Sequence, residues 1–390
     1  MPDAEKLAAV RDALPAVGAG IYLNTPIAGP IPAETARAMA DIANWELATG
    51  RTHRDRGADV AVRMDEARAG LAAVLGTDVG AIALTHGLGD GVRRAMEAID
   101  WRAGDTSIFV DDAGSALSPV AVRPRVDGTD LIHVELPAEP DGSDDVGLVS
   151  AVASVLRPGT RLVTCPHVSR TGRLLPVERL ASIAHDVGAV VLVDGSQAAG
   201  TIPVGFDELG ADLYLVAGWT WLLGPEGIGA LAAAGDLRDR LGILGERRPA
   251  QSGDFHVPSV VGLARSCGWL SMYVGLDWIF RRSADLAATV RARLRDIPGV
   301  TLLTPEHRSA TTIAFRIAGW AADQALEELG SRAFALASVV PHVDAVRIGT
   351  GFFNTDDELD RFATAVELLA THTPDTLPPR RQLTIIGGDR

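Results

Sequence analysis

The order of apolar and helical segments between residues 60 and 235 constrains the fold of this chain more than any other feature. Short runs rich in Val, Ile and Leu alternate there with segments in which apolar residues recur at helical spacing. Such runs are typical of parallel strands, because the crossover helices bury both faces of the sheet. The sequence therefore predicts an α/β fold, with strands at residues 81–84, 107–110, 161–164, 189–193, 213–216 and 229–232 and helices at 62–75, 89–99, 147–156 and 177–187.

The pattern changes after about residue 250. A long helical stretch, two strand-like runs and a closing helix are predicted at residues 259–296, 311–317, 346–348 and 355–369. Strands with helices on one face are typical of a small α+β domain. We therefore expect a large α/β domain, whose mostly parallel sheet is flanked by helices, and a small C-terminal α+β domain. An N-terminal segment should pack with the small domain, and a tail should end the chain. In chain order, these four parts are expected at residues 1–20, 21–250, 251–375 and 376–390.

Composition narrows the choice of partners. The chain has 390 residues and a formal net charge of -14. Nucleic acids and anionic membranes bind positive faces, so we expect neither as a partner and favour a small molecule. The chain has no apolar signal core at its start and no run of about 18 apolar residues, which predicts a cytoplasmic protein. The two cysteines lie far apart and no paired Cys/His spacing occurs, so we expect buried thiols and no metal site.

A motif within residues 190–230 points to a cofactor site. The predicted strand ends at Asp194-Gly-Ser-Gln197, and Gly-Trp219-Thr220-Trp-Leu-Leu-Gly-Pro-Glu-Gly-Ile-Gly follows later. This pattern resembles the class V aminotransferase and cysteine desulfurase family, which are fold type I enzymes that use pyridoxal phosphate (PLP). The family carries His-Lys in the second segment, where the lysine binds PLP as a Schiff base, and this chain has Trp219-Thr220 instead. The resemblance covers most of the chain and implies a divergent member that lacks this lysine.

The resemblance also implies roles for the residues that match. Asp194 would pair with the pyridinium nitrogen of PLP, and Gln197 would contact its phenolic oxygen. A helix-capping or turn aspartate and a turn-stabilising glutamine are the alternative interpretations. If the chain retains PLP, Leu88 and Gly89 would begin the helix that receives the phosphate group.

Several other family features are missing. Gly89 and Ala217 stand where the family has hydroxyl side chains, Asp254 stands where a threonine would reach the phosphate, and Ala113 lies where a ring would stack. Trp219 would also fill space that the cofactor ring uses elsewhere. These losses together predict a pocket that uses no cofactor. The alternative is PLP, or its amine form PMP, bound without a covalent link.

New chemistry in this pocket would need other side chains. Arg347 matches the arginine that binds the substrate carboxylate in the family, and a surface salt bridge is the alternative. His86 and His167 follow predicted strands, so either could serve as a general acid or base, or as a structural hydrogen-bond partner. Thr220 and Trp219 would line the same pocket as Asp194 and complete the set of candidate catalytic residues.

The sequence therefore gives one main hypothesis and two alternatives. The main hypothesis is a PLP-independent enzyme that acts by acid/base or electrostatic catalysis on a small carboxylate-bearing metabolite, in a specialised pathway such as natural-product biosynthesis. The first alternative is an aminotransferase, desulfurase or lyase-like enzyme that binds PLP or PMP without the covalent link. The second is a noncatalytic binding or scaffold protein. The resemblance also implies a homodimer.

Overall fold

A computed structural model describes residues 3–111, 124, 126–136, 145–242 and 255–379. The expectations placed on Ala113 and Asp254 lie outside these residues, as does the last part of the predicted tail. Within the described residues, no helix combines the length and the apolar character needed to cross a membrane.

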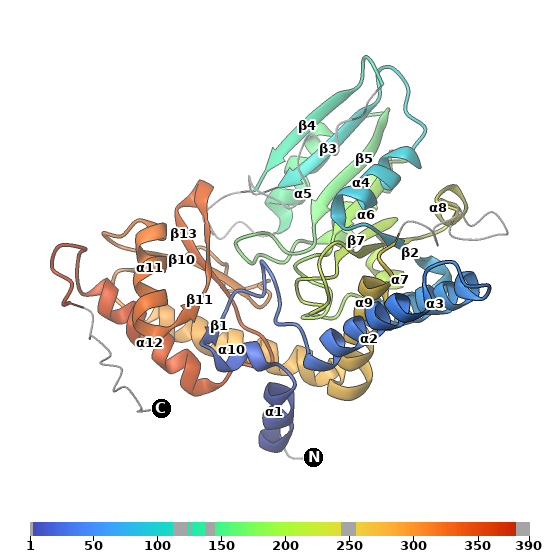
Figure 1. Ribbon diagram of the computed structural model, residues 1–390. Coiled ribbons are helices and arrows are strands. Elements are labelled where there is room, and N and C mark those ends of the chain that lie inside the picture. Colours follow the sequence, from blue (N-terminus) through green and yellow to red (C-terminus); the bar gives the residue numbers. More distant parts are fainter. Residues whose placement is uncertain (1–2, 112–123, 125, 137–144, 243–254, 380–390) are drawn as a thin grey trace.

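A seven-stranded sheet forms the centre of the large domain (Figure 1). Its order is β2-β8-β7-β6-β5-β3-β4, and β8 alone runs antiparallel to its neighbours in this sheet. The mostly parallel sheet of the prediction is therefore confirmed. Its strands are β2 (Ile82–Thr85), β3 (Thr106–Asp111), β4 (Asp130–Glu135), β5 (Thr160–Pro166), β6 (Val190–Asp194), β7 (Leu213–Ala217) and β8 (Gly229–Ala233).

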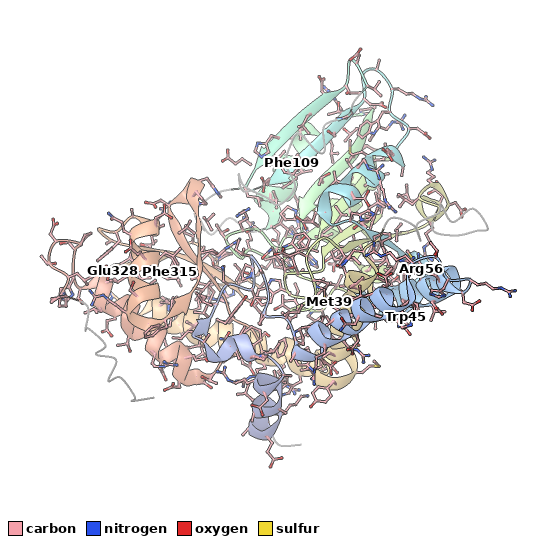
Figure 2. All side chains as sticks on the ribbon, in the orientation of Figure 1. Met39, Trp45, Arg56, Phe109, Phe315 and Glu328 are labelled. Atoms are coloured by element: carbon pink, nitrogen blue, oxygen red, sulfur yellow. The ribbon has the colours of Figure 1, made fainter. Side chains whose placement is uncertain are left out.

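The burial of these strands explains which of them the sequence predicts. All five residues of β7 and of β8 are buried, in keeping with their continuous apolar runs. The edge strand β4 is not predicted, because it mixes polar and apolar residues and buries only Val134 along its length. Phe109 lies inside the sheet core of the large domain, as Figure 2 shows.

Helices cover the sheet and build its outer layers (Figure 1). The pair α2 and α3 packs against α9, and this contact extends the main core of the large domain. We expected residues 257–268, which form α9, in the small domain, whereas their buried side chains belong to the core of the large domain. The helices of this part are α2 (Ala33–Thr49), α3 (Arg56–Leu75), α4 (Leu88–Glu97), α5 (Asp145–Val155), α6 (Val177–His185), α7 (Phe206–Leu209), α8 (Leu237–Arg240) and α9 (Val257–Gly268).

The long predicted helical stretch is interrupted. A π-helical turn, η3 (Trp269–Val274), follows α9, and α10 (Leu276–Arg295) begins after Gly275. Gly275 has a φ of +88°, a conformation that side chains of L-residues rarely adopt, so the chain changes direction there. α10 then carries the chain from the large-domain core to the small domain (Figure 1).

The small domain is an antiparallel sheet with helices packed on it. Its strand order is β12-β13-β10-β9, and its apolar core includes Phe315 of β10 (Figure 2). The N-terminal helix α1 (Asp3–Asp12) is tied to this domain through an ion pair between Arg11 and Glu358 at 2.7 Å. The elements of the small domain are β9 (Val300–Leu302), β10 (Thr312–Ile317), α11 (Ala322–Ala333), β12 (Ser338–Val340), β13 (Ala345–Gly349) and α12 (Asp356–Ala370). A separate short pair joins β1 (Ile21–Tyr22) to β11 (Ala335–Leu336).

Candidate functional site

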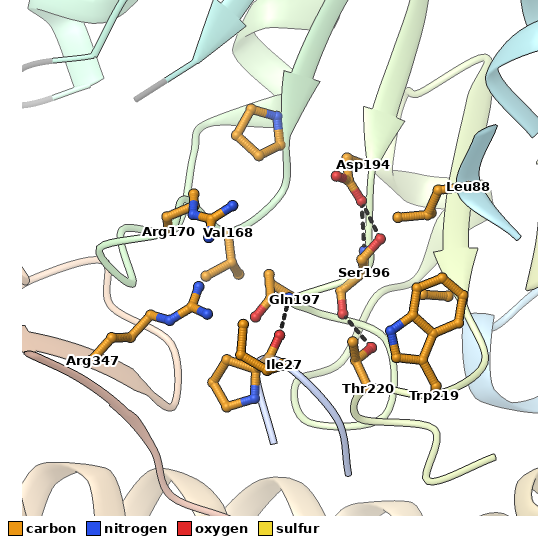
Figure 3. Close-up of a pocket in the computed structure, with 13 residues that line it drawn as sticks. Ile27, Leu88, Val168, Arg170, Asp194, Ser196, Gln197, Trp219, Thr220 and Arg347 are labelled. Atoms are coloured by element: carbon orange, nitrogen blue, oxygen red, sulfur yellow. Dashed lines mark hydrogen bonds between the residues drawn. The ribbon is translucent and has the colours of Figure 1, made fainter. Parts of the chain in front are cut away.

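A pocket of about 160 Å³ lies at the carboxyl ends of the central strands, where the large domain meets the small one. Open α/β sheets bind ligands at this edge, and the sequence predicted a site there. Residues that follow β5, β6 and β7 line one part, and Arg347 of the small-domain sheet lines another (Figure 3). The described lining residues are Pro26, Ile27, Leu88, Pro166, Val168, Arg170, Asp194, Ser196, Gln197, Ala217, Trp219, Thr220 and Arg347.

Asp194 ends β6 and lies against the pocket with only 5% of its surface exposed. Its Oδ1 accepts a hydrogen bond from the Ser196 backbone N–H at 2.9 Å and a shorter one from the Ser196 hydroxyl. Burial raises the pKa of the Asp194 carboxyl above its usual range, although the Ser196 hydrogen bonds favour the charged form. Asp194 is therefore a buried carboxyl group at the carboxyl end of a central strand, and its bond to the N–H two residues further on is that of a turn aspartate, so it has the turn role and also lines the pocket.

Thr220 and Gln197 hold the surroundings of Asp194 in place. The Thr220 hydroxyl donates to the backbone carbonyl of Ser196 at 2.8 Å, so it supports the residue that binds Asp194 (Figure 3). Gln197 Nε2 donates to the Pro26 carbonyl at 2.9 Å, whereas Gln197 Oε1 is buried without a partner among the described residues. Thr220 is thus a positioning residue, and Gln197 presents an unsatisfied acceptor next to the pocket.

Two arginines lie on the side of the pocket opposite Leu88 and Trp219 (Figure 3). Arg347 is 2% exposed, and its Nε donates to the Ser338 hydroxyl at 3.1 Å across the β12–β13 pair. Arg170, in the loop after β5, was not among the site residues predicted from the sequence, although His167 at the start of the same loop was. The position of Arg170 just after a strand end was the signal that could have identified it.

The structure does not bring His86 or His167 into this pocket. Pro166 and Val168 line it, and His167 lies between them, so the alternation of side chains turns the imidazole to the other side of the chain. A hydrogen bond of 2.7 Å joins His167 Nδ1 to the Tyr214 hydroxyl. Burial, with a smaller effect of Arg308, lowers the pKa of His167 to about 4.

The ring of His86 also lies away from the pocket. It stacks on Phe255 with 4.2 Å between ring centroids, and the residue is exposed. His86 lies two residues before α4, and its backbone N–H donates to Asp90 Oδ2 at 3.1 Å. Both histidines therefore have structural partners, and the expected acid/base roles have no geometric support.

Trp219 and the start of α4 form the side of the pocket that faces away from the arginines (Figure 3). A Cβ added to Gly87 would lie 3.5 Å from the Trp219 ring, so the indole covers the turn that begins the helix. A Cβ added to Gly89 would meet no atom within 4 Å. Leu88 lines the pocket, and open space adjoins the first turn of α4 at Gly89.

The lysine content of the chain bears on whether PLP could be attached covalently. The sequence contains a single lysine, Lys6. Its Nζ lies 4.6 Å from the centre of the Trp278 ring, where α1 packs on α10, and Lys6 does not line the pocket. An amine for covalent attachment of PLP is therefore absent from the described lining of this pocket.

Comparison with known proteins identifies relatives that cover between 58% and 90% of this chain. The isopenicillin N epimerase of Streptomyces clavuligerus is 28% identical over 386 residues, which cover 90% of this chain and 94% of that protein. The isopenicillin N epimerase of Amycolatopsis lactamdurans is 32% identical over 60% of this chain and 66% of its own length. A probable cysteine desulfurase of Mycolicibacterium paratuberculosis is 29% identical over 58% of this chain and 37% of its own length.

Solved structures share the fold at lower identity. A lysine-to-alanine mutant of C-DES, with glycine covalently linked to its PLP cofactor, has a TM-score of 0.81 and 20% identity, and it matches 92% of this chain and 98% of that one. The cysteine desulfurase CsdA of Escherichia coli has a TM-score of 0.75 and 22% identity over 93% of this chain and 97% of its own. These similarities support the fold type I architecture predicted from the motif.

A family model described as aminotransferase class-V matches residues 21–362. Together with the PLP-linked structural neighbour, this match overturns our expectation that the pocket uses no cofactor, because both point to PLP. The expectation counted missing side chains, yet the backbone N–H groups of a helix N-terminus can bind a phosphate group whatever side chains they carry. The family model spans most of the sequence. This chain belongs to the class V aminotransferase family.

Proposed function

We propose that this chain is an enzyme that holds PLP or PMP without a covalent link and acts on a small, carboxylate-bearing substrate of amino-acid type. One observation carries the proposal: the pocket keeps Asp194 and Arg347, while Thr220 stands in place of the lysine. The similarity to isopenicillin N epimerase over 90% of the chain supports chemistry at the carbon next to a carboxylate and a place in natural-product biosynthesis.

The described residues fit the cofactor at three points. Asp194 supplies a buried carboxyl group for the pyridine nitrogen, and Gln197 Oε1, a buried acceptor without a partner among the described residues, would accept a hydrogen bond from the phenol O–H of the cofactor. The space next to Gly89 leaves room for a phosphate group at the first turn of α4, where the helix dipole and free N–H groups favour an anion. PLP, when bound, supplies an electron sink for negative charge that develops on the substrate.

A lysine is not required to keep PLP on this type of scaffold. The neighbouring C-DES structure is a lysine-to-alanine mutant and still contains the cofactor, linked to glycine. We infer that the same arrangement serves this chain, in which noncovalent contacts hold the cofactor. Such contacts make binding reversible, so the affinity for PLP or PMP depends on Asp194 and Gln197 and on the helix start.

The side chains of the pocket have separable tasks in this proposal. Arg347 binds the substrate carboxylate, and its bond to Ser338 fixes the direction of the guanidinium group. The Thr220 hydroxyl holds Ser196, which in turn orients the Asp194 carboxyl group. Trp219 covers one side and excludes water. No histidine lines the described part of the pocket, so we infer that a bound water moves the proton at the reacting carbon.

Sulfur transfer of the desulfurase type has little support. A thiol that accepts sulfur must be accessible and must ionise near neutral pH. The chain has two cysteines, Cys165 and Cys267, and both are fully buried. Burial raises the pKa of each thiol to about 12. Of the two activities named among the relatives, the buried thiols therefore favour that of the epimerases.

We also infer that the chain forms a homodimer. Large apolar side chains are exposed on α2 and on the π-helical turn, with Leu47 85% and Met272 86% exposed. Exposed apolar groups of this size are common at subunit interfaces. Light scattering on the purified protein should give twice the mass of 40.9 kDa calculated for one chain.

Deuterium exchange tests the proposed activity. The protein is incubated with PLP and a panel of amino acids in D2O, and NMR follows the loss of the proton next to each carboxylate. We expect cofactor-dependent exchange for at least one substrate. The Arg347→Gln variant should raise KM on the order of tenfold or more, because a charge-assisted fork is lost. Exchange that is equally fast without added cofactor, in protein free of PLP, would refute the proposal.

A further inference from the structure

The two pocket arginines indicate the class of substrate. Arg170 and Arg347 both line the pocket, and their guanidinium groups lie on the same side of it (Figure 3). Asp194 is the one carboxylate among the described lining residues, and Ser196 already binds its Oδ1. Two guanidinium groups thus stand against one carboxylate in the described lining, although Asp111 also acts on Asp194 from nearby and the chain as a whole carries a net charge of -14. This contrast favours an anionic ligand.

The loop that carries Arg170 is held rigidly. Ser169 accepts and donates backbone hydrogen bonds within the turn, through Gly172 N–H at 3.0 Å and the Arg173 carbonyl at 2.8 Å. Gly172 has a φ of +90°, and a Cβ added there would lie 2.0 Å from the Thr312 carbonyl oxygen. A side chain at this position would therefore collide with the small domain. The tight contact fixes the turn, and with it the backbone of Arg170, against the start of β10.

The same contact relates the two arginines to each other. β10 pairs with β13, and Ala314 of β10 lies opposite Arg347 of β13. Gly172 packs against the carbonyl group of Thr312, which lies two residues before Ala314 on β10. The same small-domain sheet therefore contacts the turn that carries Arg170 and contains the strand that carries Arg347. Leu88 of α4, where the phosphate of the cofactor is expected, lies across the pocket from them (Figure 3). Arg170 therefore serves the substrate side.

From this arrangement we propose that the substrate is a dicarboxylate, whose first carboxylate binds Arg347 and whose second binds Arg170. A planar guanidinium group binds a carboxylate with two parallel hydrogen bonds, and two such groups would select for both charges and for the spacing between them. Arg170 is then a specificity-determining residue. This inference rests on the proposed function in one respect, because it takes this pocket as the substrate site.

Calorimetric titration of the full chain with matched probes tests the proposal. Glutarate and pentanoate have the same carbon chain and differ in one terminal carboxylate. We expect the wild-type protein to bind glutarate at least about tenfold more tightly, as the gain of a charged hydrogen-bonded pair implies. Arg170→Gln should abolish this preference and leave the pentanoate affinity within about twofold, whereas Arg347→Gln should weaken both ligands.

Two further variants serve as a control and as a substitute in case Arg170→Gln does not fold. Arg161→Gln changes an arginine at the opposite end of β5, where it pairs with Asp105 at 3.2 Å, and should leave the preference intact. If Arg170→Gln does not fold, Arg170→Lys keeps the charge and loses the fork, so it should retain only part of the preference. Equal affinities for glutarate and pentanoate in the wild type, or a preference that survives in Arg170→Gln, would overturn the proposal.

The test of the dicarboxylate inference can be separated from the test of cofactor binding. PMP binding is measured on the same samples by its fluorescence, without either probe. If the glutarate preference depends on Arg170 and PMP does not bind, the dicarboxylate inference stands and the cofactor proposal fails. If PMP binds and the preference is absent, the reverse holds.

Discussion

Acid titration of His167 distinguishes a structural histidine from a general base. The imidazole is buried and bonded to Tyr214, and its pKa is lowered from 6.5 to about 4. Above pH 6.5, His167 is mostly neutral in the folded and unfolded chains, so its contribution to stability is constant. As the pH falls from 6.5 towards 4, the unfolded chain takes up a proton and the folded chain does not, so the free energy of unfolding decreases.

The size of this loss follows from the two pKa values. The difference between 6.5 and about 4 is about 2.5, and each pKa unit corresponds to about 1.4 kcal/mol, so His167 alone removes about 3 kcal/mol by the end of the window. At about pH 5 the loss is already about 2 kcal/mol. The His167→Gln variant should therefore lose about 2 kcal/mol less than the wild type between about pH 7.5 and pH 5.

Urea unfolding at the two pH values measures this difference, and NMR of histidine-labelled protein reports the pKa directly. His185→Gln is the matched control, because His185 is partly exposed and pairs with Asp212 at 2.9 Å on the surface. The His167 resonance, assigned by its absence in His167→Gln, should not titrate above about pH 5 in the folded protein. A midpoint near pH 6.5 would refute the structural interpretation and restore His167 as a candidate base.

Three other variants test the pocket and the packing around Tyr214. Thr220→Lys places an amine beside Ser196 and should convert reversible PLP binding into a covalent link, which borohydride reduction and mass spectrometry would detect. Thr220→Ser keeps the hydroxyl group, so PLP binding to this variant should stay noncovalent. Gly195→Ala should destabilise the protein by about 3 kcal/mol, because the new Cβ would lie 2.0 Å from the buried Tyr214 ring; recovery of wild-type thermal stability in this variant would contradict the packing.

Part of the site follows from the sequence because strand ends are predictable. Asp194, Gln197 and Arg347 were predicted from motifs that follow or lie within apolar runs, and all three line one pocket. The direction of a side chain just after a strand is harder to predict. A one-residue difference in register separates Pro166 and Val168, which face the pocket, from His167, which does not.

Other features depend on contacts between distant segments. Arg170 gains its position from the packing of Gly172 on β10, which lies 140 residues further along the chain and which local patterns do not reveal. The strand β4 lies at a sheet edge and mixes exposed polar residues with apolar ones, so it lacks the continuous apolar run of the inner strands. The cofactor expectation was wrong because it weighed lost side chains and left out the backbone at the start of α4, since a helix N-terminus can bind an anion through its N–H groups alone.

Reversible binding of the cofactor is the central claim, and one measurement tests it most directly. PMP and PLP are titrated into purified protein that has been freed of cofactor, and the absorbance and fluorescence give the affinity. Each sample is then reduced with borohydride, denatured and dialysed. The account predicts saturable binding of both forms, weakened in Asp194→Asn, and full release of the cofactor after denaturation. Absence of binding, or cofactor that stays attached to the wild-type chain after reduction, would contradict it.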